Sequence, residues 1–402
     1  MAAAVQRRRE GASQPSVTFD AWDDVPSETE EEEEEETGAV TPAPGSPRER
    51  LRSRTFSLPP AAKDSLTHTY AFGGIHHIFC EHAAAITTVA FAQMDADLLA
   101  FASRDGKISL ARVRQDPRVV HSLEGHTGAV LDVAWSQSNE YLLSVSEDKT
   151  QRLWDTENGE CMRIVYNTTV PRRAVFHPRN ANEYVTGNDD RTIQVWNLST
   201  GKLNYTQKVP GVPLGMAFDM QGGHLYVGDD QGTLTTFAHN AKNGRLVTNR
   251  RSKLALCPGH AITNVAYRGT WAKGRTQPSL LVNCGDGLVR MLDQAPDSER
   301  MVQTHQFAIR QRHERIRSCF CPLIPVGRGA CITTGSEDGI IYLFDCTADV
   351  AKECINKLQG HSSPVMAVDW TFSESVLASG DADGSVLLWK REQTTNTGKI
   401  DE

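Results

Sequence analysis

The sequence lacks the features of a membrane protein and of a disulfide-stabilised secreted domain. No run approaches the roughly 18 apolar residues that a membrane-spanning helix needs. The nine cysteines are an odd number, contain no CxxC pair and follow no regular spacing. Three arginines follow a short start of small residues, and no apolar segment of a signal peptide comes after them. We therefore expect reduced thiols and a nuclear or cytoplasmic location, with no membrane association.

Negative charge is concentrated in one segment. Residues 1–65 hold eight basic and fourteen acidic side chains, including the unbroken run Glu30–Glu36. The rest of the chain carries 34 basic and 36 acidic side chains, so it is nearly neutral although the net charge is −8. A charged segment without apolar periodicity cannot bury enough surface to fold. We predict a disordered acidic tail over 1–65, a folded domain over 66–393 and a short disordered C-terminus over 394–402.

From Tyr70 onward, short β-branched and aromatic runs alternate with turns rich in Asp and Gly, which is typical of an all-β protein. Two segments of this region align without gaps. In both, a Gly-His pair is followed by an aspartate 22 residues after the histidine and by a tryptophan 28 residues after it. The two sets are His126, Ser144, Asp148 and Trp154, and His361, Ser379, Asp383 and Trp389.

Weaker copies of the same pattern fill the intervals. Three have a turn aspartate followed six residues later by an aromatic or apolar residue, and two are degenerate, at Asp105 and at either Asp229 or Asp230. With Asp230 taken for the last of these, the turn aspartates recur at intervals of 40 to 56 residues. The seven turn aspartates are Asp105, Asp148, Asp190, Asp230, Asp286, Asp338 and Asp383. The region therefore consists of seven units.

The Gly-His and Trp-Asp signatures at this spacing resemble the WD-repeat family. The resemblance implies that each unit is a four-stranded blade of a β-propeller. Unit seven ends after its third strand, and an open ring would expose strand edges, so Tyr70–Phe79 is the expected donor of the missing strand. The predicted fold is all-β: a seven-bladed WD-repeat β-propeller closed by an N-terminal strand and preceded by a disordered acidic tail.

The resemblance also implies that each complete set of His, Ser, Asp and Trp forms a buried hydrogen-bonded chain. The residue types suit this role, because Trp only donates, a carboxylate only accepts, and Ser and His can do both. Ser, His and Asp also occur together in serine hydrolases. However, Ser144 and Ser379 lie within apolar strand sequences, whereas a nucleophile must be exposed. We expect structural tetrads, no catalytic residue, no metal and no cofactor.

A partner-binding face is expected where the residues that precede the turn aspartates line one side of the ring. The resemblance places these residues near the central channel, and most of them are acidic. We therefore expect this face to attract basic peptides. The residues are Arg104, Glu147, Asp189, Asp229 and Glu337, with Gly285 and Ala382 completing the seven positions.

Two basic motifs remain. The segment RQRHERIR (310–317) offers an anion or nucleic-acid patch, but we favour a solvated strand or loop, because the near-neutral domain argues against nucleic-acid binding. In the tail, Arg52 and Arg54 precede Ser57, with Pro59 two residues after it. This pattern favours phosphorylation of Ser57 and docking of a 14-3-3 type adaptor.

The predicted function is a non-enzymatic protein–protein interaction scaffold. The resemblance implies a subunit or regulator of nuclear chromatin or transcription complexes. The alternative is a substrate adaptor of a ubiquitin ligase, although the Trp-Asp-x-Arg motif of such adaptors is replaced by WDTE at 154–157 and WKRE at 389–392. A propeller enzyme or an RNA-binding protein is a weaker alternative.

Overall fold

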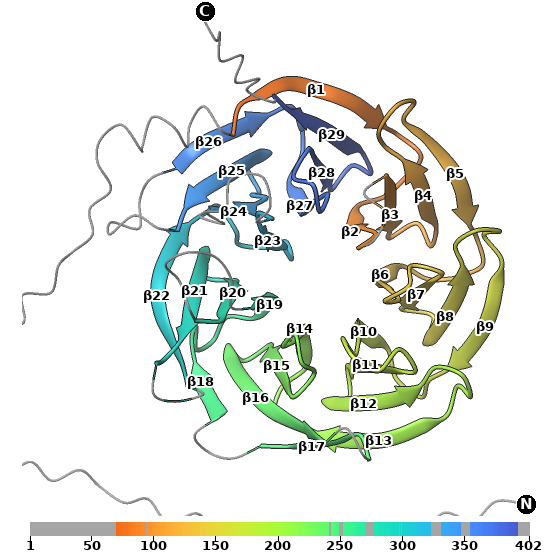
Figure 1. Cartoon of the computed structure of the whole chain (residues 1–402), viewed down its shortest axis with the longest axis vertical. Helices are drawn as coiled ribbons and strands as arrows, with labels where there is room; N and C mark the ends of the chain where they lie inside the picture. Colours follow the sequence, from red (N-terminus) through yellow and green to blue (C-terminus); the bar gives the residue numbers. More distant parts are fainter. Residues whose placement is uncertain are drawn as a thin grey trace, which may run out of the picture. The chain divides into compact units, whose positions relative to one another are not determined.

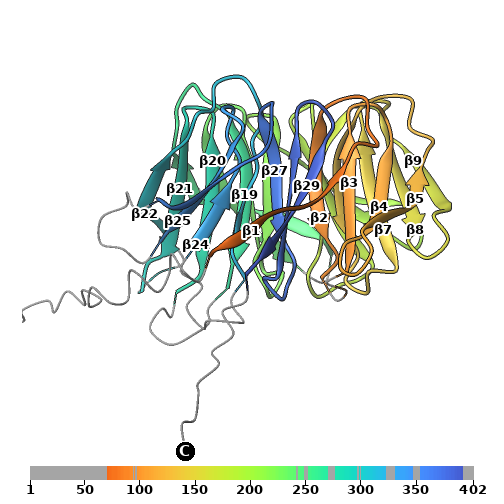
Figure 2. The ribbon, with the colours of Figure 1, turned by 90° about the horizontal axis from the view of Figure 1, so that it is seen from above.

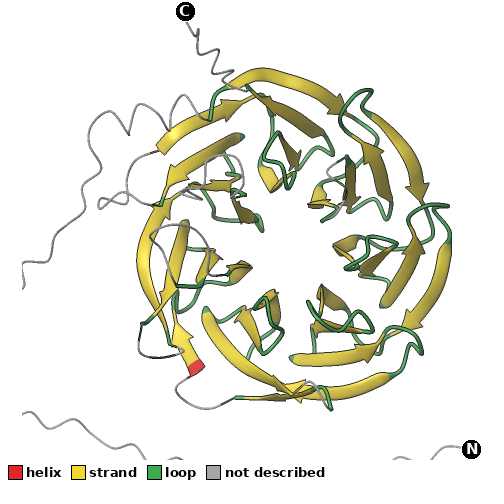
Figure 3. Ribbon diagram, viewed as in Figure 1, coloured by secondary structure: helices red, strands yellow, loops and turns green. Residues whose placement is uncertain are grey.

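Antiparallel β-sheets make up the folded part of the chain. The computed structural model describes residues 70–392 apart from 94, 96, 241–242, 249–251, 270–276, 297, 299, 323–330 and 347–353. Seven sheets, here called blades 1 to 7, surround a central axis (Figures 1 and 3). The innermost strand of each blade contacts that of the next around the full circle. The predicted seven-bladed, all-β architecture is confirmed. Ser57, Glu30–Glu36 and the two predicted disordered ends lie outside the described residues.

The first four blades follow one another directly along the chain. Blade 1 consists of β2 (Ile86–Phe91), β3 (Leu98–Ser103), β4 (Ile108–Arg112) and β5 (Arg118–Leu123). Blade 2 consists of β6 (Val130–Trp135), β7 (Tyr141–Ser146), β8 (Thr150–Asp155) and β9 (Cys161–Tyr166). Blade 3 consists of β10 (Pro171–Phe176), β11 (Glu183–Asn188), β12 (Thr192–Asn197) and β13 (Leu203–Lys208). Blade 4 consists of β14 (Pro213–Phe218), β15 (His224–Asp229), β16 (Thr233–Asn240), β17 (Arg245–Val247) and β18 (Lys253–Ala255).

The remaining blades follow the same plan. Blade 5 consists of β19 (Ile262–Arg268), β20 (Ser279–Cys284), β21 (Leu288–Gln294) and β22 (Met301–Ala308). Blade 6 consists of β23 (Ser318–Phe320), β24 (Cys331–Thr334), β25 (Ile340–Asp345) and β26 (Cys354–Gln359). Blade 7 consists of β27 (Val365–Trp370), β28 (Val376–Asp381), β29 (Val386–Arg391) and β1 (Phe72–Phe79).

The ring is closed by the two ends of the folded region. Strand β1 pairs antiparallel with β29, in a register that runs from Phe72 opposite Arg391 to Phe79 opposite Val386. Figures 1 and 2 show β1 (orange) beside β29 (dark blue), although the two strands are separated by almost the whole folded sequence. The predicted closure by an N-terminal strand is therefore confirmed.

Tyr70 anchors the entry of the chain into blade 7. Its hydroxyl donates to Glu374 Oε1 at 2.6 Å, and the guanidinium of Arg391 lies 5.1 Å from the centre of its ring. Arg391 also pairs with the other carboxylate oxygen of Glu374. Burial raises the pKa of Glu374, while Tyr70 and Arg391 oppose this effect. The strand that closes the ring is thus held by side chains as well as by backbone pairing.

The hydrophobic core lies between the blades. Phe79, Ile86 and Leu388 are buried in one cluster that joins blade 7 to blade 1. The contact is close at Gly380, where an added Cβ would lie 2.5 Å from Ile86 Cγ2. Burial of apolar side chains stabilises by about 25 cal/mol per Å2, so each blade depends on its neighbours.

In blade 2 the four residues of the first set form one hydrogen-bonded chain. His126 Nδ1 lies 2.8 Å from Asp148 Oδ2, and His126 Nε2 lies 2.7 Å from Ser144 Oγ. Trp154 Nε1 donates to the same Ser144 Oγ at 2.8 Å. Burial lowers the pKa of His126, although Asp148 opposes this shift. Since the carboxylate can only accept, His126 is neutral with its proton on Nδ1, and Ser144 donates to Nε2.

In blade 7 the structure corrects one member of the second set. His361 Nε2 lies 2.7 Å from Ser379 Oγ, and Trp389 Nε1 donates to that oxygen at 2.8 Å. However, His361 Nδ1 bonds to Asp381 at 2.8 Å and not to Asp383. The carboxylate of Asp381 stands at the end of β28, and it also accepts the backbone N–H of Asp383. The gapless alignment failed here because a residue two positions earlier reaches the same imidazole.

Blade 1 contains a related chain that the sequence pattern did not reveal. His82 Nδ1 lies 2.9 Å from Asp105 Oδ2, and His82 Nε2 lies 3.1 Å from Ser109 Oγ. No glycine precedes this histidine, and no tryptophan follows in β4. The remaining signal was the interval of 23 residues between His82 and Asp105, which is close to the 22 of the complete set.

We expect Asp381→Ala to lower the free energy of unfolding by about 1–3 kcal/mol, because it leaves the buried imidazole of His361 without an acceptor. Asp383→Ala is the matched control two residues away, and exposed substitutions of this kind change stability by about 0.5 kcal/mol or less. Urea unfolding of both variants tests the assignment. Equal losses, or a larger loss for Asp383→Ala, would contradict it.

A pH-dependent prediction concerns Asp369 on β27, which accepts the backbone N–H of Phe91 at 2.8 Å. Burial raises the pKa of Asp369 to about 7, and backbone N–H donors oppose this shift only in part. The folded protein therefore retains a proton that the unfolded chain loses near pH 4, so stability falls as the pH rises from about 4 to about 7. We expect Asp369→Asn to gain stability relative to the wild type across this window. Urea unfolding at several pH values tests this, and a constant difference would refute it.

Candidate functional site

The turns between the second and third strands of the blades lie on one face of the ring, here called the channel face. At seven equivalent positions a backbone N–H donates across to the segment that leads into the innermost strand of the same blade. This recurring bond defines which residues are equivalent. They are Arg104, Glu147, Asp189, Asp230, Gly285, Glu337 and Ala382.

Asp229 is therefore not a residue of this face, contrary to the sequence-based expectation. It ends β15, is 4% exposed and pairs with Pro213, as Asp381 pairs with Val365 in blade 7. Its carboxylate accepts the backbone N–H groups of Gln231 and Thr233. Asp230 takes the position on the face. Asp229 and Asp381 each follow the first glycine of a Gly-Asp-x-x-Gly sequence. This sequence is the signal that would have distinguished the turns of blades 4 and 7 from those of the other blades.

Arginine side chains already pair with some of the carboxylates that the sequence placed on the channel face. Arg172 of β10 binds Asp189 with two hydrogen bonds, of 2.5 and 2.6 Å, and lies 3.5 Å from Glu147. Arg104 lies 3.5 Å from Glu314. The channel face is consequently a mixed surface, and Asp189 has little capacity left for the basic peptide that the sequence suggested.

Glu337 is occupied in a different way. Its Oε1 accepts the backbone N–H groups of Arg312, His313 and Glu314, at 2.6 to 2.8 Å. Desolvation opposes ionisation, but these three donors lower the pKa of Glu337. The carboxylate therefore fixes the loop that leads into β23, and it orients the arginine-rich segment 310–317.

A buried carboxylate joins blades that are not neighbours in the ring. Asp132 of β6 is 2% exposed, and its Oδ1 lies 3.2 Å from Arg173 of blade 3 and 2.5 Å from Arg317 of blade 6. Arg173 also donates to Asn264 of blade 5. Blades 2 and 6 are separated by blades 7 and 1, so the Arg317 side chain reaches across the central opening. Burial opposes ionisation of Asp132, but Arg173 and Arg317 lower its pKa.

A cavity of about 410 Å3, here called the vestibule, borders this network at Arg317. Four arginines and one carboxylate contribute to its lining, and partial desolvation together with Arg172 lowers the pKa of Arg315. The lining residues are Thr87, Arg104, Ala129, Leu131, Glu147, Arg172, Leu214, Thr263, His313, Arg315, Arg317 and Met366.

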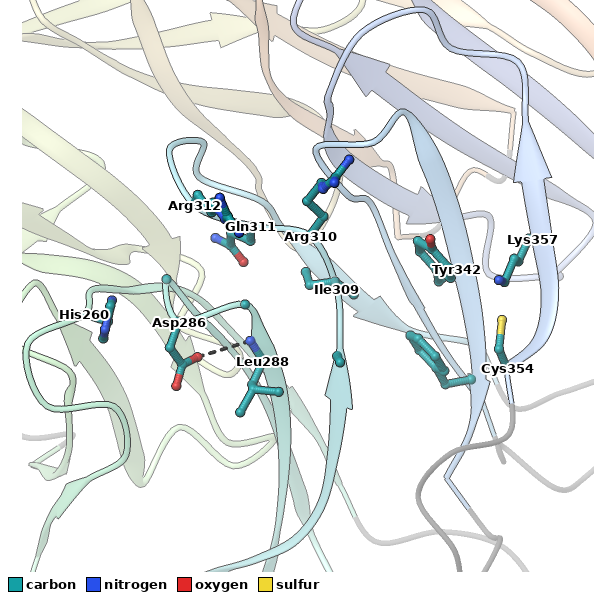
Figure 4. Close-up of a pocket in the computed structure, with 14 residues that line it drawn as sticks. His260, Asp286, Leu288, Ile309, Arg310, Gln311, Arg312, Tyr342, Cys354 and Lys357 are labelled. Carbon is teal, nitrogen blue, oxygen red and sulfur yellow. Dashed lines mark hydrogen bonds between the residues drawn. The ribbon is translucent and has the colours of Figure 1, made fainter.

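A second cavity of about 820 Å3, here called the groove, lies between blades 5 and 6 (Figure 4). Its cations are Arg310, Arg312 and Lys357, and its apolar lining includes Leu288 and Ile309. The one carboxylate in the lining, Asp286, binds Arg290 and the N–H of Leu288.

The structure thus places segment 310–317 between two cavities. Arg310 and Arg312 line the groove, whereas Arg315 and Arg317 line the vestibule. Our expectation of a solvated strand or loop is correct for the exposed Arg310, Arg312 and Arg315. It is wrong for Arg317, whose side chain is 15% exposed and bonded to Asp132.

The Ser-His-Asp arrangements do not provide an accessible nucleophile. Ser144 and Ser379 have no exposed surface, and each serine oxygen also accepts a tryptophan N–H. Nucleophilic catalysis requires a serine that substrate can reach. The geometry of these sets is therefore that of a structural network.

One cluster among the described residues has the composition of a metal site. His177, Glu183 and His239 place one possible ligand atom each within 4.8 Å of one another. However, His177 Nδ1 accepts the backbone N–H groups of Arg179 and Asn180, so the proton of the neutral ring is on Nε2. That proton is directed to the carbonyl of Gly222. His177 is thus used by its own turn, and a protonated nitrogen cannot bind a metal.

Comparison with known proteins agrees with this fold. The family model described as WD domain, G-beta repeat matches residues 117–155 and 352–390, which contain the two complete sets. The β-propeller domain of Cps50 (Swd1) from Myceliophteria thermophila superimposes with a TM-score of 0.62, covering 79% of this chain and 99% of that one at 19% identity. This similarity concerns the fold alone.

Two relatives match part of this chain. Jouberin of Mus musculus is 26% identical over 263 residues, which are 61% of this chain and 23% of that protein. Pre-mRNA-processing factor 17 of Mus musculus is 31% identical over 129 residues, which are 32% of this chain and 22% of that protein. The chain thus spans about a quarter of the length of these relatives.

The repeat signatures, the closed ring of seven blades and these similarities together identify the class of protein. This chain carries WD repeats over residues 117–155 and 352–390 and folds as a seven-bladed β-propeller. In the described part of the chain, no helix has the length and apolar character to cross a membrane.

We expect Asp132→Ala to lower the free energy of unfolding by about 3–5 kcal/mol, since it leaves the guanidiniums of Arg173 and Arg317 without their shared counter-charge. Urea unfolding measures the loss. A second substitution, Arg317→Met, removes one of the two uncompensated charges and should recover part of the loss. If Asp132→Ala costs less than about 1 kcal/mol, or if the double variant is less stable than the single one, the network does not carry this role.

Proposed function

We propose that this protein is a non-enzymatic scaffold that binds partner proteins on its channel face, as a subunit or regulator of nuclear multiprotein complexes. The observation that supports the proposal is that the buried Ser and His side chains and the accessible charged side chains have different roles in the ring. The residues with catalytic potential, Ser144 with His126 and Ser379 with His361, are consumed by buried structural bonds. Accessible polar and charged side chains instead line the groove and the vestibule.

The rigidity of the ring supports this role. Apolar clusters join each blade to its neighbours, and the Asp132 network joins blades across the opening. A preorganised surface loses little conformational entropy when a partner binds. The name of one relative, pre-mRNA-processing factor 17, supports a role in nuclear complexes. The fold alone does not specify function, because propellers carry many activities.

Site-specific photo-crosslinking tests where partners bind. A photo-reactive amino acid replaces Glu147, an exposed residue of the channel face. The matched control carries it at Tyr166, which is 77% exposed on the outer strand of the same blade. We expect crosslinked proteins from nuclear extract at position 147 and far fewer at 166. Crosslinking confined to position 166 would refute binding on the channel face.

A further inference from the structure

Four cations around segment 310–317 have no carboxylate partner within the described residues. Arg310, Arg312 and Lys357 line the groove, and Arg315 lines the vestibule. All four are exposed, and the side-chain contact of Lys357 is with the ring of Tyr342, 5.4 Å away. In Figure 4, Arg310 and Arg312 lie on one side of the groove, and Lys357 and Tyr342 lie on the other.

The neighbouring carboxylates are already bound. Asp286 pairs with Arg290, Glu314 with Arg104, and Glu337 with three backbone N–H groups. Asp338, beside the groove, accepts the hydroxyl of Tyr342 at 2.8 Å. The positive charge of the four cations is therefore not neutralised by direct pairing, although the folded domain as a whole is nearly neutral.

We propose that the groove and the adjoining part of the vestibule bind an extended acidic segment of a partner protein. Carboxylates of that segment pair with Arg310, Arg312 and Lys357 in the groove and with Arg315 at the vestibule. This inference rests on the proposed scaffold function, because it specifies the chemistry of a partner. It also reverses the sign of the peptide that the sequence alone suggested.

Three features favour an acidic peptide as the occupant. Guanidinium groups bind carboxylates with two parallel hydrogen bonds, which gives both strength and orientation. Glu337 fixes the backbone of Arg312, so this cation is presented on an ordered loop. The lining residues Leu288 and Ile309 provide apolar surface for side chains between the acidic ones.

The same surface is poorly suited to single-stranded nucleic acid. Such ligands bind through stacking of bases on aromatic rings as well as through phosphate contacts. Tyr342 is covered by Lys357 and held by Asp338, and Phe344 is 7% exposed, so neither ring is a free platform.

Fluorescence anisotropy with the full chain tests the proposal. The probe is a short labelled peptide of glutamates interspersed with leucines, and the comparison probes are the same peptide with lysines for glutamates and a single-stranded RNA. We expect the acidic peptide to bind, the basic one not to bind, and the affinity to fall with added salt. Arg310→Glu with Arg312→Glu should raise the Kd about tenfold or more, because two charge-assisted contacts become repulsive.

The matched control is Arg245→Glu with Arg300→Glu. It changes the net charge by the same amount at exposed arginines that do not line the groove, and it should change the Kd less than about twofold. Arg310→Gln with Arg312→Gln should give an intermediate affinity. Thermal melting is compared for every variant, and the Gln pair keeps the test valid if the Glu pair unfolds.

Each outcome decides the proposal. Absence of acidic-peptide binding, equal weakening by the control pair, or tighter RNA binding that the groove variants abolish would overturn it. The scaffold function is judged separately by the crosslinking at position 147. If crosslinked partners persist while the acidic peptide fails to bind, the function stands and the assigned ligand chemistry is wrong.

Discussion

The antiparallel pairing of β1 with β29 is the constraint on which the rest of the molecule depends. Without β1, blade 7 would end in an unpaired strand, and no segment of the chain would link blade 7 to blade 1. Because the apolar core lies between blades, an open ring would also expose the cluster that joins blade 7 to blade 1. The bond between Tyr70 and Glu374 strengthens this closure where the strand begins.

Closure in turn makes the channel face possible. Residues from blades 2, 3, 5 and 6 meet around Asp132 only when all seven blades surround one axis. The buried carboxylate holds Arg173 and Arg317, and Glu337 fixes the backbone of the loop that carries Arg312. The polar interior of the ring thus supports the surface that we propose for partners, and this surface carries unpaired positive charge although most of its named turn residues are acidic.

The sequence predicted the fold better than it predicted the site. Periodic His, Ser, Asp and Trp positions indicated seven blades and the donor of the last strand, since these depend on local spacing. The assignment of Asp383 failed because Asp381, two residues earlier, bonds to the imidazole of His361. The assignment of Asp229 failed because this residue is the buried equivalent of Asp381 in blade 4, where it accepts backbone N–H groups of its own turn. The chain of His82, Asp105 and Ser109 was missed because it lacks the glycine and tryptophan of the signature.

The sequence by itself therefore determined the number of blades and the complete set of blade 2, because hydrogen-bonding types and strand alternation repeat locally along the chain. It also determined the closing strand, because unit seven ends one strand short. Tertiary structure alone decided the charge of the channel face, where we propose that partners bind. Arg172 and Asp189 are 17 residues apart, and Arg317 and Asp132 are 185 apart. Pairing over such distances determines which charges are neutralised and which remain for a partner, and no local pattern encodes it.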